Sequence, residues 1–348
     1  MALKISLMPI VSDGHGDLCA SIEEMVVDSL RSVGVGIQVY SNPDDLKSAS
    51  DFLLVGLGQW GRGSVREALR EAPKYGVRRT LWQLETLPPP EILKSIAARF
   101  LLRRTPDRVT GLARLADKLA LKRISRETRG PPWCYGDLES RRFSLPFREA
   151  RRIRAIWRDG LVDKIIVSME SRLNFLRSIG VDSTFVPLGY HPLWGRPLDK
   201  MERDLDVVFI GIPTPARMRL LDHMQARLSG AGFHLTVVER DCYGDQRTEL
   251  LNRAKILIHL RNYPWELTRM RMLMAMGCKA LLMAEESEDI KPFLPGRHMV
   301  MARHENLADT AIYYLRHEEA RAEITQQAYS FVSTELELGK ILGKELME

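Results

Sequence analysis

The sequence is poor in cysteine, and the placement of its cysteines excludes two kinds of protein. Only four are present among 348 residues, far apart in the chain and without a Cys-x-x-Cys pair. This argues against a zinc site or a disulfide framework and favours a reducing compartment. Acidic residues are not clustered at the spacing of a hard-cation site either, so no metal is expected. No other cofactor is expected.

Long hydrophobic runs are missing as well. No stretch approaches the roughly 18 apolar residues that a membrane-spanning helix needs. Residues Leu3–Val11 have the pattern of a short buried strand, without a basic leader or a small-residue cleavage site. We therefore expect a cytoplasmic protein. An apolar content of 45% and a charged content of 28% are typical of a folded protein, and the length suits two domains.

Positive charge is concentrated in one part of the chain. The formal net charge is +6, but residues 99–158 alone contain 17 Lys and Arg against 6 Asp and Glu. Within them, apolar residues at helical spacing lie among bases over 112–123. Such a segment fits peripheral contact with the inner face of a membrane, and equally the solvated face of an ordinary helix. Nucleic acid is not expected, because no aromatic residues are interleaved with the bases.

Short apolar runs alternate with amphipathic helical patterns, which predicts mostly parallel sheets with helices on both faces. The strands expected in the first half are 4–11, 37–40, 52–57, 80–84, 164–168 and 184–186, and those in the second half are 207–210, 235–239, 255–260 and 280–283. A charged linker at 199–206 separates the two series.

We therefore predict an α/β protein with two Rossmann-like, doubly wound domains that face a cleft. The first domain is 1–198 and includes the basic helical segment 99–158, and the second is 205–332. Residues 333–348 are expected to form a C-terminal helix that packs back on the first domain.

Two loops of the first half carry candidate functional residues. Ser12–Asp17 contains Gly14 and Gly16, which allow close approach of a ligand, and His15, a candidate general base. Its alternative interpretation is a polar turn. Gly56–Gly61 has the spacing Gly-x-Gly-x-x-Gly of a dinucleotide-binding fingerprint. Because it follows the third strand and not the first, a glycine-rich turn is favoured over nicotinamide or flavin binding.

Glu85 ends the next strand, where a carboxylate can bind an acceptor hydroxyl or take its proton. It is also placed to pair with a nearby arginine. In the second half, Gly211 ends a strand and precedes a helix that carries Arg217 and Arg219. Either arginine can clamp a diphosphate, or both can be solvated.

The segment after strand 255–260 has the highest density of polar candidates. Glu266 is suited to accept hydrogen bonds from sugar hydroxyls, and the candidate phosphate-binding residues are His259, Arg261, Thr268, Arg269 and Arg271. A helix capped by Thr268 is expected to begin here, and a helix N-terminus beside arginines favours an anion.

The second half resembles a GT-B glycosyltransferase, and more narrowly the group 1-like family related to glycosyltransferases of the spore-maturation-protein type. The resemblance runs over 206–332, with a weaker match at 164–191. Its strand, glycine and spaced arginine correspond to Val208–Gly211 with Arg217. The pattern Arg-x-x-Glu-Ala-x-Ala-x-Gly corresponds to Arg271–Lys279.

This resemblance implies transfer of a sugar from a UDP- or GDP-type donor to an unknown acceptor, without a metal. Arg217 and Arg271 would then face the diphosphate, and Gly14–Gly16 would lie across the cleft. Glu266 matches the first of two donor-binding glutamates, but Met274 occupies the second, ribose-binding position. A thioether cannot accept two strong hydrogen bonds from ribose hydroxyls.

The acceptor and the stereochemistry stay open at this point. The basic first half would hold the acceptor, which fits an acidic or membrane-associated molecule. Glu266 favours retention, whereas His15 or Glu85 as the base favours inversion. Three other functions are kept as alternatives: a non-catalytic GT-B scaffold or binding protein, favoured by Met274; an NAD(P)-dependent oxidoreductase that uses Gly56–Gly61; and a nucleotide-sugar epimerase.

Overall fold

The chain divides into two α/β units. The computed structural model describes residues 3–10, 16–56, 63–94, 96, 99, 102, 144–212, 214–239, 242–261, 266–287 and 289–348. Unit 1 comprises Met1–Pro187 and Leu342–Glu348, and unit 2 comprises Leu188–Ile341. Among the described residues, none of the helices has the length and apolar character needed to cross a membrane.

Unit 1 is built on a six-stranded parallel sheet with the order β2-β1-β3-β4-β5-β6. Its strands are β1 (Lys4–Ile10), β2 (Gly36–Val39), β3 (Asp51–Gly56), β4 (Arg78–Gln83), β5 (Lys164–Val167) and β6 (Thr184–Phe185). β3 is buried along its whole length, because apolar residues on both faces of this central strand are covered by helices.

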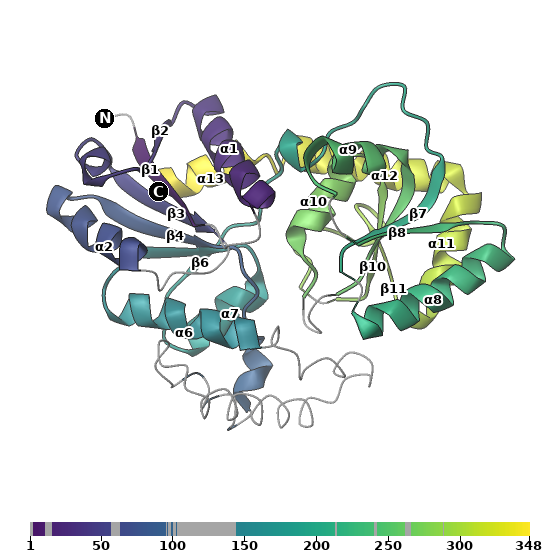
Figure 1. Cartoon of the computed structure of the whole chain (residues 1–348), viewed down its shortest axis with the longest axis horizontal. Coiled ribbons are helices and arrows are strands. Elements are labelled where there is room, and N and C mark those ends of the chain that lie inside the picture. Colours follow the sequence, from purple (N-terminus) through teal and green to yellow (C-terminus); the bar gives the residue numbers. More distant parts are fainter. Residues whose placement is uncertain are drawn as a thin grey trace. The chain divides into compact units, whose positions relative to one another are not determined.

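Helices cover both faces of this sheet. They are α1 (Gly16–Ser32), α2 (Gly63–Glu71), α6 (Ser144–Arg158) and α7 (Glu170–Ser178), with the last part of α13 (Leu338–Met347). α1 and α13 lie on one side of the strands and α6 and α7 on the other (Figure 1). The end of α13 is held by Arg78, which donates to the carbonyl of Leu346 at 2.6 Å, and by the ion pair of Lys164 with Glu345.

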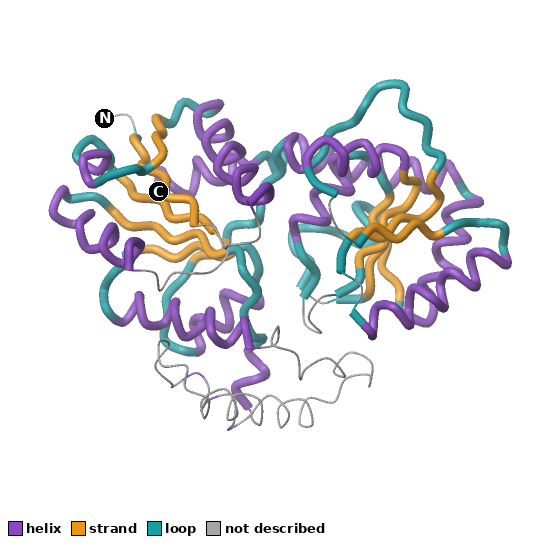
Figure 2. The backbone as a smooth tube through the Cα atoms, in the orientation of Figure 1, coloured by secondary structure: helices purple, strands orange, loops and turns teal. Residues whose placement is uncertain are grey.

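Unit 2 contains a five-stranded parallel sheet with the order β11-β10-β9-β7-β8. Its strands are β7 (Leu205–Ile210), β8 (Leu235–Val238), β9 (Ala254–His259), β10 (Leu281–Glu285) and β11 (Val300–Ala302), and its helices are α8 (Pro215–Gly230), α9 (Gly244–Arg253), α10 (Arg269–Gly277), α11 (Leu307–Arg316) and α12 (Glu318–Thr334). α8 and α11 lie on one side of this sheet, and the strands run as a layer between helices (Figures 1 and 2). Val207, Phe209 and Ile258 are among the fully buried residues of its core.

Each sheet reverses its strand order next to its first strand. Numbered within its own unit, the order is 2-1-3-4-5-6 in unit 1 and 2-1-3-4-5 in unit 2. Doubly wound sheets bind ligands outside the carboxyl ends of the strands at this reversal. It lies between β1 and β3 in unit 1 and between β7 and β9 in unit 2. The predicted fold class of two doubly wound sheets is thus confirmed.

Candidate functional site

His259 is a fully buried polar group at the reversal point of unit 2. It ends β9, and neither of its ring nitrogens has a hydrogen-bond partner in the described part of the chain. Burial, followed by the positive charges of Arg271, Arg217 and Arg269, lowers the pKa of His259 well below its usual value. The ring is therefore neutral at pH 7 and carries one N–H donor and one acceptor. Both ring nitrogens of His259 therefore lack a hydrogen-bond partner among the described residues, although three arginines lie nearby.

Arg271 lies against the glycine turn that follows β7. A Cβ atom added to Gly211 would be 3.0 Å from its Nη2, and Gly211 has a φ of 139° that favours glycine. No hydrogen bond or ion pair joins the guanidinium to another of the described residues. Burial lowers the pKa of Arg271 to about 10, so the group stays charged at neutral pH. A desolvated cation that no described side chain or carbonyl pairs with is suited to an anionic ligand.

Arg217 holds backbone in place, a role that the sequence analysis did not predict. Its guanidinium donates to the carbonyls of Ile212 at 3.1 Å, Leu260 at 2.7 Å and Arg261 at 3.1 Å. The side chain is 7% exposed. It therefore joins the turn after β7 to the end of β9, and its predicted contact with phosphate remains a prediction.

His259, Arg217, Arg269 and Arg271 form one cluster, here called the arginine cluster. Arg219 is separated from it by helix geometry. Two residues along an α-helix rotate a side chain by about 200° around the axis. Arg217 lies in the first turn of α8 and is buried, whereas Arg219 is exposed. The structure therefore does not bring the two candidate arginines together.

Arg261 and Arg269 are each paired with an acidic residue. The backbone N–H of Arg261 donates to Glu285 Oε2 at 2.7 Å, and its guanidinium lies 3.5 Å from Oε1. Arg269 donates to the carbonyl of Asp289 and lies 3.4 Å from its carboxylate. Sequence reasoning missed Glu285, although its place at the end of an apolar run carried the same signal as the other candidates.

The N-terminus of α10 lies within this cluster. The helix begins at Arg269, and Thr268 occupies the N-cap position without a side-chain capping hydrogen bond. Thr268 thus occupies the predicted N-cap position, but the predicted capping hydrogen bond from its side chain is not formed. Glu266 comes two residues earlier and is 3% exposed. A helix start without a side-chain cap leaves N–H groups and partial positive charge for a ligand.

Met274 and Lys279 occupy two positions at which the chain departs from the resembled motif, standing in place of its Glu and its final Gly. Met274 is buried on α10, and its carbonyl accepts a hydrogen bond from the backbone N–H of Cys278 at 3.2 Å. Lys279 has a φ of 53° and follows the helix end, where glycine is usual. Its Nζ lies 4.8 Å from the ring centroid of Tyr329, a cation–π contact that glycine could not make.

The candidates of unit 1 are only partly described. Gly14, His15 and residues 57–62 lie outside the described residues, and Gly16 begins α1. Glu85 is half-buried just after β4, and its carbonyl accepts a hydrogen bond from Gln83 Nε2. Over the described ranges, no group of three or more His, Cys, Asp and Glu residues is placed to hold a metal ion.

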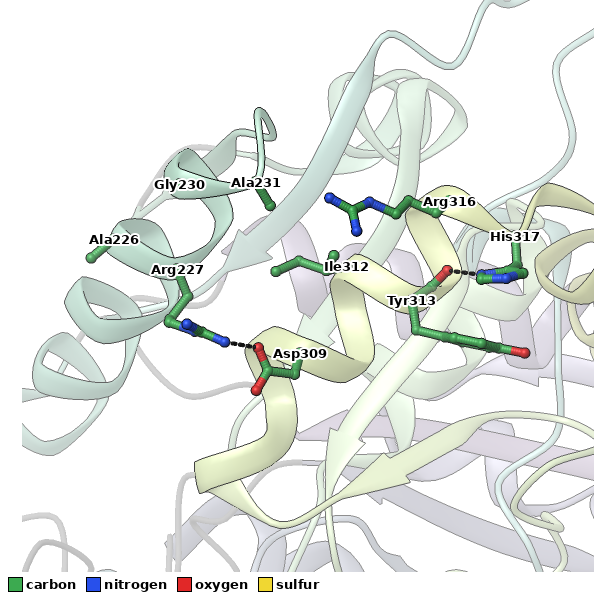
Figure 3. Close-up of a pocket in the computed structure, with 9 residues that line it drawn as sticks. All are labelled: Ala226, Arg227, Gly230, Ala231, Asp309, Ile312, Tyr313, Arg316 and His317. Carbon is green, nitrogen blue, oxygen red and sulfur yellow. Dashed lines mark hydrogen bonds and ion pairs between the residues drawn. The ribbon is translucent and has the colours of Figure 1, made fainter.

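A groove of about 540 Å³ lies elsewhere on unit 2, between α8 and α11. Ile312 and Arg316 point toward the last turn of α8, and the Arg227–Asp309 ion pair lies at one side (Figure 3). α8 starts at the carboxyl end of β7 and runs back past the sheet, so its last turn is at the opposite edge from His259. The groove is therefore separate from the arginine cluster.

The unit that carries this cluster is similar to a known family. Residues 215–341 match the family described as glycosyl transferase-like. The sucrose-phosphate synthase of Thermosynechococcus elongatus superposes with a TM-score of 0.55 at 10% identity, over 99% of this chain and 98% of that one. The fold is GT-B.

Two further GT-B structures are similar to the chain. HepE from Anabaena, solved with UDP and glucose, has a TM-score of 0.51 at 10% identity, with 99% of this chain and 98% of that chain covered. TarM has a TM-score of 0.52 at 12% identity, over 86% of this chain and 54% of its own. No curated protein matches the chain. At these identities the likeness shows the GT-B fold.

Proposed function

We propose that this GT-B protein is a glycosyltransferase that transfers a sugar from a nucleoside diphosphate sugar, of UDP or GDP type, to an acceptor. The observation that carries the proposal is the pair of His259 and Arg271. Both are polar groups without a described protein partner, at the strand ends where this fold binds ligands. The family match over 215–341 spans both residues and supports the same function. We also propose that the chain is related more narrowly to glycosyltransferases of the spore-maturation-protein type.

The cluster can stabilise the departing diphosphate. Negative charge grows on the leaving group as the bond to the sugar breaks, and preorganised cations and N–H groups lower the energy of that state. Arg271 and the start of α10 would provide this stabilisation, and His259 would add a neutral donor. A metal ion does the same in other enzymes by charge neutralisation. We propose that transfer here proceeds without one.

Glu266 would bind the hydroxyl groups of the donor sugar. It is the acidic residue nearest in sequence to the start of α10, and it is buried. A carboxylate there accepts hydrogen bonds that orient the sugar against the diphosphate. Glu85, at the carboxyl edge of the first sheet, is proposed to bind the acceptor hydroxyl.

Glu266→Gln is expected to lower turnover by about 100-fold, because the amide keeps the shape but loses the negative charge and replaces one of the two acceptor oxygens with a donor. Release of UDP or GDP from UDP-glucose, UDP-N-acetylglucosamine and GDP-mannose measures this, with EDTA present throughout to test metal independence. The affinity of the Glu266→Gln variant for UDP or GDP should stay within a few-fold of that of the unaltered chain. Glu319→Gln is the matched control, since Glu319 is exposed at the start of α12.

Met274 favours a second candidate function, a non-catalytic scaffold that keeps the fold. Its side chain supplies no strong acceptor for ribose. The same assay separates the two functions. A scaffold would turn over none of the donors, and equal turnover by the Glu266→Gln variant and the unaltered chain would refute the assigned site.

A further inference from the structure

Arg148 lies at the carboxyl edge of the first sheet and has no hydrogen-bond or ion-pair partner in the described part of the chain. It is half-buried in the second turn of α6, and its guanidinium makes no hydrogen bond or ion pair with any described residue. Burial and the like charge of Arg152 lower the pKa of Arg148, and the charges of Glu149 and Glu85 act in the opposite direction. Its positive charge is thus desolvated without being neutralised by a direct contact.

Gln83 provides a second unmatched polar group at the same place. It is the last residue of β4 and is fully buried. Its Nε2 donates to the carbonyl of Glu85, but its Oε1 has no hydrogen-bond partner among the described residues. Buried acceptors are almost always satisfied by protein, water or a ligand. The next residue, Leu84, has its carbonyl oxygen 2.9 Å from Arg172 Nη1, which donates a hydrogen bond to it.

The two groups share one edge because of the chain direction. α6 leads into β5, so it runs antiparallel to the strands and its first turns lie at their carboxyl ends. β4 ends at that edge with Gln83, and the charge of Glu85 acts on Arg148. The edge therefore combines a cation, an unused acceptor and a carboxylate next to the reversal point between β1 and β3.

We propose that this edge binds the acceptor of the transfer reaction and that the acceptor is a sugar that carries an anionic group. Arg148 pairs with the carboxylate or phosphate of that sugar, Gln83 Oε1 accepts from one of its hydroxyls, and Glu85 lies beside the reacting hydroxyl. This assignment rests on the proposed glycosyltransferase function. An arginine fork suits both anions, because each presents two oxygens to it.

The test compares three probes that differ at one carbon: methyl glucoside, methyl glucuronide and methyl glucoside 6-phosphate. Binding to the full chain is measured by ligand-observed NMR titration, with UDP and GDP present to occupy the donor site. We expect one anionic probe to bind at least tenfold more tightly than the neutral one, because a charge-assisted hydrogen bond contributes about that factor. The two anionic arms distinguish a carboxylate from a phosphate.

Arg148→Gln should abolish this preference, and Arg148→Lys should restore part of it by returning the charge without the planar fork. Arg154→Gln is the matched control on the exposed face of α6 and should keep the full preference. Equal binding of the three probes by the unaltered chain, or a preference that survives in Arg148→Gln, would overturn the assignment. Nucleotide binding by the unaltered chain, measured separately, reports on the proposed function alone.

Discussion

Arg271→Gln is expected to weaken the binding of a nucleoside diphosphate by about 10- to 100-fold. Hydrogen bonds to a charged group contribute about 1.5–3 kcal/mol, and this residue provides the desolvated cation at the start of α10. Calorimetric titration with UDP and GDP measures the loss. Arg316→Gln removes the same charge from the separate groove of unit 2 and should bind both nucleotides as the unaltered chain does.

The same substitution should leave the unliganded protein at least as stable. Burial lowers the pKa of Arg271 to about 10 in the folded chain, well below the ordinary value of an arginine. A base with a lowered folded pKa opposes folding while it is protonated, and this cost is present across the neutral range and lost only as pH rises above about 10. Thermal unfolding without ligand checks this point. A clear fall in melting temperature would show that Arg271 supports the fold instead of a ligand.

Arg217→Met is expected to lower the free energy of unfolding of unit 2 by about 3–5 kcal/mol. Three backbone carbonyls lose a charged donor, and each buried polar group left unsatisfied costs about 1–3 kcal/mol. The contact of the guanidinium with the ring of Phe209, 5.8 Å from its centroid, is lost as well. Methionine keeps much of the volume, so packing changes contribute little.

Scanning calorimetry measures this effect as a transition of unit 2 at lower temperature. Arg219→Met is the matched control, because Arg219 is exposed on the same helix and should change stability by less than about 0.5 kcal/mol. Similar losses in both variants would show that the carbonyl contacts do not stabilise the unit. Loss of stability should also weaken nucleotide binding, because Arg217 fixes the turn beside Arg271 and the end of β9.

The place of the candidate residues at the carboxyl edge of the second sheet could be predicted from the sequence, because strand ends can be recognised from apolar runs. The run 255–260 predicted β9 within one residue, and a parallel sheet places every such end at one edge. His259, Arg261 and Arg269 could therefore be assigned together. The direction of individual side chains was not accessible in this way. Arg217 and Arg219 carry the same chemistry, and only helix phase separates the buried residue from the exposed one.

The hydrogen-bond and ion-pair partners of individual side chains could also not be predicted from the sequence. Thr268 is a suitable capping residue by type, but hydrogen bonding depends on a side-chain rotamer that sequence does not specify. Arg148 was one of many bases in a basic segment, and the sequence could not show that no described residue pairs with it. Glu285 was reachable by the strand-end argument, but it opens an acidic run, 285–289, and sequence alone does not show which of these carboxylates faces Arg261.

The central claim is that the carboxyl edge of the second sheet recognises the phosphates of a nucleotide sugar. Calorimetric titration of the unaltered chain with UDP and GDP, each beside its free nucleoside, tests this most directly. At least one diphosphate should bind with a Kd more than tenfold below that of uridine or guanosine, since the cluster contacts phosphate and not base. If the diphosphates bind no better than the nucleosides, or do not bind, the account is contradicted.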